Sequence, residues 1–81
     1  MTRGGAGGIG VVIGRITVVQ EDRVRIVDDE GRGYLLVVRK RAASLDELEH
    51  WRDGRVRLRV YYTGAPDAGG LAQAMEAVRS E

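Results

Sequence analysis

The 81-residue chain has no cysteine, no phenylalanine and one proline, and its aromatic residues are three tyrosines and one tryptophan. Without cysteine the chain can form neither disulfide bonds nor thiolate metal sites, as expected for a protein of the reducing cytoplasm. The longest apolar run, from Ile9 to Ile13, is far shorter than the roughly 20 residues of a membrane-spanning helix. The start, Met1-Thr2-Arg3, lacks the apolar segment of a signal peptide. We therefore expect a cytoplasmic protein.

The residues that most often carry catalysis or bind metal are also scarce. His50 is the only histidine, and without a second histidine or a cysteine it indicates neither a zinc site nor a general base. The acidic run Asp28–Glu30 lacks the spacing of a calcium loop and is typical of a turn. Residues 5–10 match G-x-G-x-x-G, but no strand precedes them and no helix follows, as a dinucleotide site requires. These absences predict a protein that is not an enzyme and has no cofactor or metal.

Charged residues are plentiful but nearly balanced, with 13 cations, 12 anions and a formal net charge of +1. Only Lys40 is a lysine, so twelve of the cations are arginines, whose planar guanidinium suits phosphates and carboxylates. A net charge near zero argues against general electrostatic attraction to nucleic acid. A positive surface would require arginines gathered on one face.

Glycine and the alternation of apolar residues predict one small domain. Residues 1–8 are glycine-rich and predict a disordered lead-in, and residues 9–81 predict a single β-barrel domain. β-Branched or alternating segments predict strands at Ile9–Val19, Arg23–Val27, Tyr34–Arg39 and Arg55–Tyr62. Gly10 and Gly14, inside the first of these strands, indicate a bend or bulge.

A helix is predicted between the third and fourth strands. Ser44 and Glu47 form a capping box, and Gly54 ends the segment. An apolar face follows from the spacing of Leu45, Leu48 and Trp51. The tail from Leu71 to Arg79 is ambiguous, because its alanines favour a helix whereas the order of the preceding elements calls for a fifth strand.

This order of elements resembles the small OB-fold barrels of the cold-shock and initiation-factor kind. The likeness is carried by Ser44-Leu45-Asp46, by Asp53-Gly54-Arg55-Val56 and by Gly70 with Ala74 and Val78. The resemblance implies that the tail is a strand. It also implies a mainly β fold, a five-stranded OB-like barrel with one short helix between strands 3 and 4. An SH3-like barrel would fit the same pattern.

Two rows of arginines are the candidate binding residues. Arg55, Arg57 and Arg59 alternate along the fourth predicted strand and Tyr61 extends their row, while the second strand carries Arg23 and Arg25. On one shared surface the two rows would follow a phosphate backbone, and Tyr61 or the third-strand residue Tyr34 would stack a base. This arrangement predicts binding of single-stranded RNA or DNA. Alternatively, the arginines pair with acidic residues of neighbouring strands.

A second hypothesis is a protein-interaction or homo-oligomeric assembly module without a nucleic-acid role. Residues 35–38 are apolar on both faces of their strand, so both faces need cover, and a strand edge could pair with another copy or another protein. Among the aromatic residues, Trp51 and Tyr62 are predicted to lie in the core, and Tyr34 and Tyr61 to be exposed.

Overall fold

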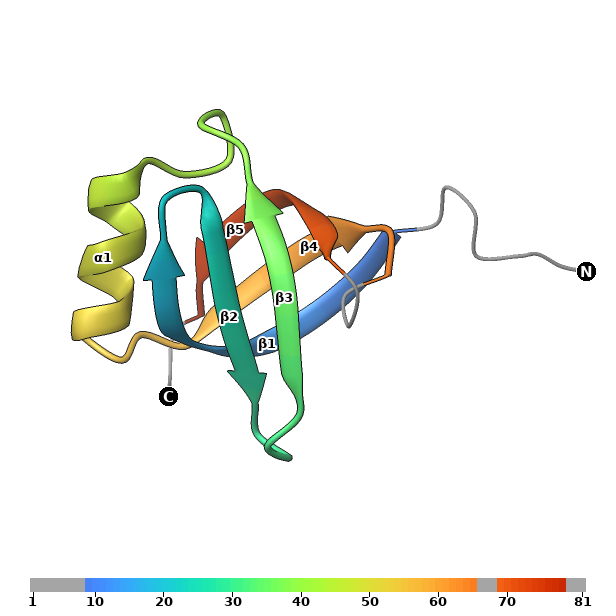
Figure 1. Ribbon diagram of the computed structural model, residues 1–81. Coiled ribbons are helices and arrows are strands. Elements are labelled where there is room, and N and C mark those ends of the chain that lie inside the picture. The colour runs from blue at the N-terminus through green and yellow to red at the C-terminus, as the bar shows by residue number, and fades with distance from the viewer. Residues whose placement is uncertain (1–8, 66–68, 79–81) are drawn as a thin grey trace, which may run out of the picture.

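Five strands close into a ring in the computed structural model, which describes residues 9–65 and 69–78 (Figure 1). The strands are β1 (Ile9–Gln20), β2 (Arg23–Asp28), β3 (Gly33–Val38), β4 (Leu58–Thr63) and β5 (Gly70–Ala77), and the helix α1 (Leu45–Asp53) lies between β3 and β4. The predicted fold class, mainly β with five strands and one short helix, is confirmed. The tail is the predicted fifth strand, and the predicted disorder of residues 1–8 lies outside the described residues.

The strand order around the ring is β1-β2-β3-β5-β4, with β4 closing on β1. Every pairing is antiparallel except that of β3 with β5, which is parallel and joins Leu36–Val38 to residues 70–72. The sheet is therefore mixed, and its one parallel pairing spans only three residue pairs.

β1 belongs to two walls of the barrel, and Gly14 is the residue where it changes neighbour. Gly14 pairs with Leu58 of β4 on one side and with Asp28 of β2 on the other. A Cβ atom at this position would collide with the backbone carbonyl of Val27, so only glycine allows the two strands to approach this closely. A register shift in the pairing with β2 lies between Ile16 and Val18, beyond the two glycines at which a bend or bulge was predicted.

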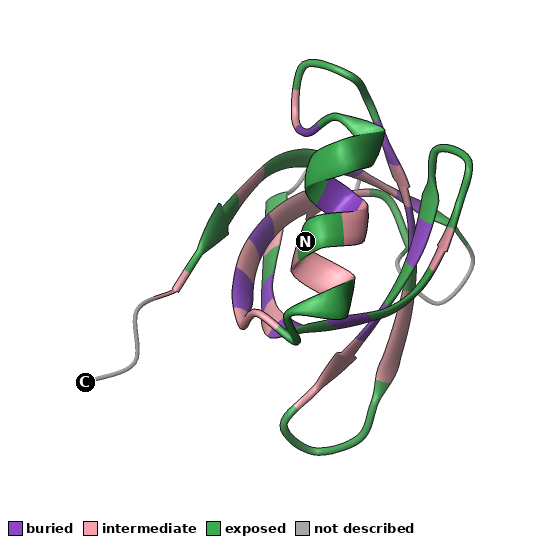
Figure 2. Ribbon diagram, turned by 90° about the vertical axis from the view of Figure 1, so that its left-hand side faces the viewer, coloured by how far each residue is buried: buried purple, intermediate pink, exposed green. Residues whose placement is uncertain are grey.

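Alternate residues of the strands point inward and form one apolar core. The buried side chains are those of Val12, Ile16, Val24, Ile26, Leu36, Val38, Ala43, Leu48, Leu58, Val60 and Ala72. Figure 2 shows these positions alternating with exposed ones around the ring. No polar side chain of the described residues is buried with them. Inward and outward positions of these strands are thus well separated.

Helix α1 begins as its sequence predicts. The Ser44 hydroxyl accepts a hydrogen bond from the Glu47 N–H (3.1 Å), and the Glu47 carboxylate accepts one from the Ser44 N–H (3.0 Å). Leu48 is buried and Trp51 packs against the core, while Leu45 remains half exposed. The helix therefore covers the core through a narrow apolar face. At nine residues it is too short to cross a membrane, and it is the only helix in the described part of the chain.

Candidate nucleic-acid interface

Arg23 and Arg25 project outward from β2. Their side chains alternate with those of Val24 and Ile26, which are buried in the core. The alternation is a consequence of the pleat, which directs successive side chains to opposite faces of a sheet. Both arginines are exposed, as the sequence predicted.

The cross-strand neighbours of these two arginines are mostly aliphatic. Arg25 lies between Val18 of β1 and Leu35 of β3, and Arg23 lies between Gln20 and Val37 on the same strands. None of these four neighbours is acidic. The two cations therefore stand in the middle of a largely apolar outer surface.

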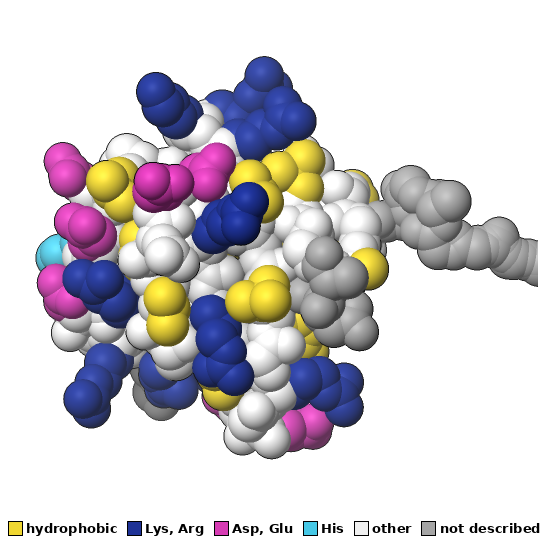
Figure 3. Space-filling view, viewed as in Figure 1, with side chains coloured by type: hydrophobic (Ala, Val, Ile, Leu, Met, Phe, Trp, Pro, Cys, Tyr) yellow, Lys and Arg dark blue, Asp and Glu magenta, His cyan; other side chains and the backbone are white. Residues whose placement is uncertain are grey.

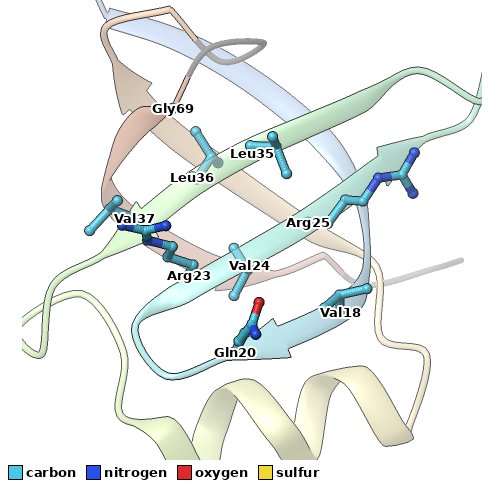
Figure 4. A pocket seen from close by; sticks show the side chains of 9 residues that line it. All are labelled: Val18, Gln20, Arg23, Val24, Arg25, Leu35, Leu36, Val37 and Gly69. Carbon is cyan, nitrogen blue, oxygen red and sulfur yellow. The ribbon is translucent and has the colours of Figure 1, made fainter.

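This surface is hollowed into a groove of about 580 Å³ (Figure 4), which we call the β2 groove. It is lined by Val18, Gln20, Arg23, Val24, Arg25, Leu35, Leu36, Val37 and Gly69. Val18 and Leu35 are 48% and 50% exposed, so this face presents aliphatic surface to solvent. The groove thus offers apolar contact along its length and positive charge from Arg23 and Arg25.

No carboxylate within the described residues forms an ion pair with Arg23 or Arg25. Arg25 makes one long hydrogen bond, from Nη1 to the Thr17 hydroxyl (3.5 Å). Its guanidinium lies across Gly33, since a Cβ at that position would come within 2.8 Å of Nη2. Most donors of both guanidinium groups therefore remain available to a ligand.

A further basic segment, the turn Arg39-Lys40-Arg41, follows β3. All three residues are exposed. The turn begins beside the β1–β2 turn, because the Val38 N–H donates a hydrogen bond to the Asp22 carbonyl (2.6 Å). Figure 3 shows basic side chains both over β2 and β3 and at the upper end of this face. These three residues were not among the predicted binding residues, although three consecutive basic residues are a visible signal in the sequence.

The second predicted row behaves differently, because its arginines have acidic partners. Arg59 of β4 lies opposite Glu76 of β5 and forms an ion pair with it (3.0 Å). The hydrogen bond to Glu76 raises the pKa of Arg59, and the Tyr61 hydroxyl also approaches this carboxylate (3.5 Å). Arg57, just before β4, is paired with Asp29. In this row the guanidinium groups are already engaged within the molecule.

Arg55 does not belong to that row. β4 begins at Leu58, three residues later than predicted, and Arg55 lies in the preceding turn with a φ of 53°. Its backbone carbonyl accepts a hydrogen bond from Nε of Arg15 (3.2 Å). The alternation of residues 55–62 continued through this turn and gave no sign of where the strand starts.

Tyr34 points into the barrel and is not exposed as predicted. It lies opposite Ile26, packs against the core and has its ring centroid 6.3 Å from that of Tyr62. Its hydroxyl donates a hydrogen bond to Asp28 (3.1 Å), and burial together with this carboxylate raises the pKa of Tyr34. It therefore cannot stack a base beside Arg23 or Arg25. Tyr62 packs against the core as predicted.

The two arginine rows do not share a surface. β2 and β3 form the front wall in Figure 1, and β4 lies behind them across the core. Outward side chains of these two walls diverge, so Tyr61 and Arg59 lie far round the barrel from Arg23. The continuous strip with an aromatic end that the sequence suggested is absent from the described structure, and the β2 groove is the surface that remains.

The acidic run between β2 and β3 forms a turn, as predicted. Asp28 accepts hydrogen bonds from the N–H groups of Arg32 and Glu30 (both 2.9 Å). These bonds, that of Arg32 first, lower the pKa of Asp28 against the opposing effect of burial. Within residues 9–65 and 69–78 no cluster of histidine and acidic side chains could hold a metal ion.

Comparison of the chain with models of protein families, with curated protein sequences and with solved structures finds no match.

Proposed function

We propose that this protein is a non-enzymatic binding module of the OB type whose ligand is single-stranded nucleic acid, held in the β2 groove. The ring order β1-β2-β3-β5-β4 and the helix between β3 and β4 support the OB assignment. In such barrels the outer face of strands 2 and 3 is a common site for oligonucleotides. The β2 groove lies on the corresponding face of this chain.

The observation that carries the proposal is a pair of guanidinium groups, without a carboxylate partner among the described residues, in a largely apolar groove. Arg23 and Arg25 lie two residues apart on one strand, hence about 7 Å apart along it. That spacing is comparable to the separation of successive phosphates on an extended single strand. Each planar fork can donate two parallel hydrogen bonds to one phosphate.

The rest of the ligand would contact the aliphatic side chains. Val18, Leu35 and Val37 offer apolar surface to sugars and base faces, and the basic turn 39–41 would hold the next phosphates. No aromatic residue lines the groove, so stacking, the usual source of affinity for single strands, is replaced by aliphatic contact. We therefore expect moderate affinity with little preference among bases, and no discrimination between RNA and DNA by the groove itself.

Fluorescence anisotropy with labelled single-stranded RNA and DNA, recorded over a range of salt concentrations, tests this proposal. If four phosphates are neutralised, log K falls with log salt with a slope of about −3. The double variant R23Q/R25Q should bind about tenfold or more weakly, with a slope reduced by about 1.4. Neutralising the basic turn in R39Q/K40Q/R41Q should reduce the slope further.

The matched control is R57Q/R59Q, which removes the same charge from the opposite wall, where both arginines already have carboxylate partners. This variant should bind within about threefold of the wild type. Equal losses from the two double variants would show that only net charge matters, and would refute the groove as the site. No binding by the wild type at low salt would refute the nucleic-acid ligand altogether.

A further inference from the structure

The first half of β1 has an open edge. Residues 9–14 pair with β4, whereas β2 pairs only from Gly14 onward. Within the described residues, Ile9–Ile13 therefore have a strand neighbour on one side only. Figure 1 shows this half of β1 running away from the β2–β3 hairpin, and a cleft of about 290 Å³ separates residues 11–13 from the hairpin turn at Asp28–Glu30.

The hydrogen-bonding pattern shows which backbone groups face this edge. The Val78 N–H donates to the Arg57 carbonyl (2.8 Å), so odd-numbered residues of β4 bond to β5 and even-numbered ones to β1. Val60 lies opposite Val12, so the even-numbered residues of β1 bond to β4. The N–H and C=O groups of the odd-numbered residues Ile9, Val11 and Ile13 consequently point outward along the open edge.

The hydrogen bonds of the β2–β3 hairpin independently show which backbone groups of β1 point away from β4. The Asp28 N–H donates to the Arg32 carbonyl (3.0 Å), so even-numbered residues of β2 bond to β3 and odd-numbered ones, such as Val27, face β1. Val27 lies opposite Arg15, an odd-numbered residue of β1. Before the register shift, odd-numbered residues of β1 thus direct their backbone groups away from β4.

The side chains at this edge are apolar and exposed. Ile9 is 66% and Val11 52% exposed, Ile13 is partly exposed, and no residue from Ile9 to Gly14 is charged. Natural proteins usually protect an open edge with a lysine, a proline or an inward-pointing charge. None of these devices occurs between Ile9 and Gly14, so the segment is suited to pairing with another strand.

We infer that the open edge of β1 is a dimer interface, in which it pairs antiparallel with the same edge of a second copy. With Val11 opposite its own copy, Ile9 falls opposite Ile13, and all three residues with free backbone groups form hydrogen-bonded pairs that each exchange two bonds. β-Branched side chains then lie opposite one another on the outer face.

A second copy suits this edge because a two-fold axis at Val11 places that residue opposite its own equivalent and Ile9 opposite Ile13. Such symmetry penalises charged residues near the axis, and this segment carries none. The pairing would join the β5-β4-β1 walls of two barrels into one continuous sheet. Five residues from each chain are few beside the roughly 20–30 of a standard interface, so we expect a dissociation constant on the order of micromolar.

The first test is the mass in solution, measured by sedimentation over a range of concentrations. The wild type should approach twice the 8.9 kDa of one chain as its concentration rises. V11E and V11K should each remain monomeric, because like charges would face each other across the axis. An equimolar mixture of V11E and V11K should dimerise again, which only a pairing of residue 11 with itself explains. L45E, at an equally exposed hydrophobic position on α1, is the control and should dimerise like the wild type.

The second test uses only the wild type and so does not depend on how the variants fold. Amide exchange of Ile9, Val11 and Ile13 should slow by about tenfold or more from dilute to concentrated solution, while Gly10 and Val12 stay protected throughout. A wild type that stays monomeric near 1 mM would overturn the inference. So would a dimer that survives V11E, or one whose alternate amides exchange equally at all concentrations. None of these readouts involves nucleic acid, so this inference and the proposed function can fail separately.

Discussion

The arginine pair of β2 and the arginines beside and within β4 come from the same sequence pattern and differ in what lies opposite them. On β4, Arg59 faces Glu76, and Arg57 reaches Asp29 of the β2–β3 turn. On β2, Arg23 and Arg25 face Val18, Leu35, Val37 and Gln20. The first set is paired with carboxylates inside the molecule, whereas the second set has no carboxylate partner within residues 9–65 and 69–78.

The comparison shows that alternation alone does not identify a binding surface. Alternation determines which side chains point outward from the core, because the pleat of a strand has a period of two residues. The cross-strand partner determines whether an outward cation is free, and that partner is set by topology. Glu76 becomes the partner of Arg59 only because β5 inserts between β3 and β4 in the ring.

The largest effect is expected from Gly14→Ala. Gly14 is the residue at which β1 passes from β4 to β2, the two strands that carry the two sets of arginines. The added Cβ would meet the backbone of Val27, which cannot move without separating β1 from β2. We expect a loss of about 3 kcal/mol or more in the free energy of unfolding, measured with urea.

The control for this substitution is Gly31→Ala, which lies in the turn after β2. Gly31 has a φ of 86° and open space around it, so only backbone strain opposes the change. A loss of about 1 kcal/mol is expected there. If both variants lost equal stability, the close approach at Gly14 would not be the reason for its glycine.

A smaller loss in the free energy of unfolding is expected from Asp29→Asn, which removes the carboxylate partner of Arg57. Asp29 pairs with Arg57 and approaches Arg15 at 3.9 Å, and these side chains are only partly shielded from water. Exposed ion pairs of this kind stabilise a fold by about 0.5–1 kcal/mol. R23Q/R25Q should change the free energy of unfolding by less than about 0.5 kcal/mol, because no ion pair within the described residues is lost. A larger loss from R23Q/R25Q would mean that the β2 arginines have a structural role.

The smallest effect of a single substitution is expected from Asp28→Asn, which removes at neutral pH the stabilisation that the wild type loses only on acidification. The pKa of Asp28 is lower in the folded protein than in the unfolded chain. Its stabilising contribution is therefore complete above the unfolded value of about 3.9 and is lost as the pH falls through the folded value. Because Asp28 fixes the turn that carries Asp29 to Arg57, acid should loosen that ion pair as well.

Urea midpoints recorded from pH 7 downward provide the measurement. The wild type should lose stability below about pH 4, and D28N should show a shallower decline because asparagine does not titrate. Parallel declines in the two proteins would mean that other carboxylates dominate the acid response.

Much of the fold could be predicted from local signals. The capping box of Ser44 and Glu47 placed the helix, and the turn at Asp28–Glu30 separated β2 from β3. The tail could not be assigned from its own residues, because its alanines favour a helix. It is a strand because β4 and β3 provide hydrogen-bonding partners for residues 70–77. A contact between segments distant in sequence therefore overrides the local preference.

The candidate site was predicted only in part, for the same reason. The exposure of Arg23 and Arg25 followed from alternation. The ion pairs could not be predicted in this way, because the partner of Arg57 lies in the β2–β3 turn and that of Arg59 lies in β5. Tyr34 was misplaced because its strand is apolar on both faces, so the pattern did not show which face points inward. The apolar groove beside Arg25 combines residues of three strands, and no local sequence pattern reports such a combination.

The short parallel pairing of β3 with β5 also has a kinetic consequence. The ring closes through three residue pairs whose members are separated by more than 30 positions in the chain. β1 likewise pairs with β4 through residues that are 44 to 54 positions apart. Such distant pairings make folding slow relative to helical domains of this size, in the range of milliseconds to seconds. The β1–β2–β3 meander, which carries the groove, is local enough to form first, and ring closure by the last strand is the step that we expect to limit the rate.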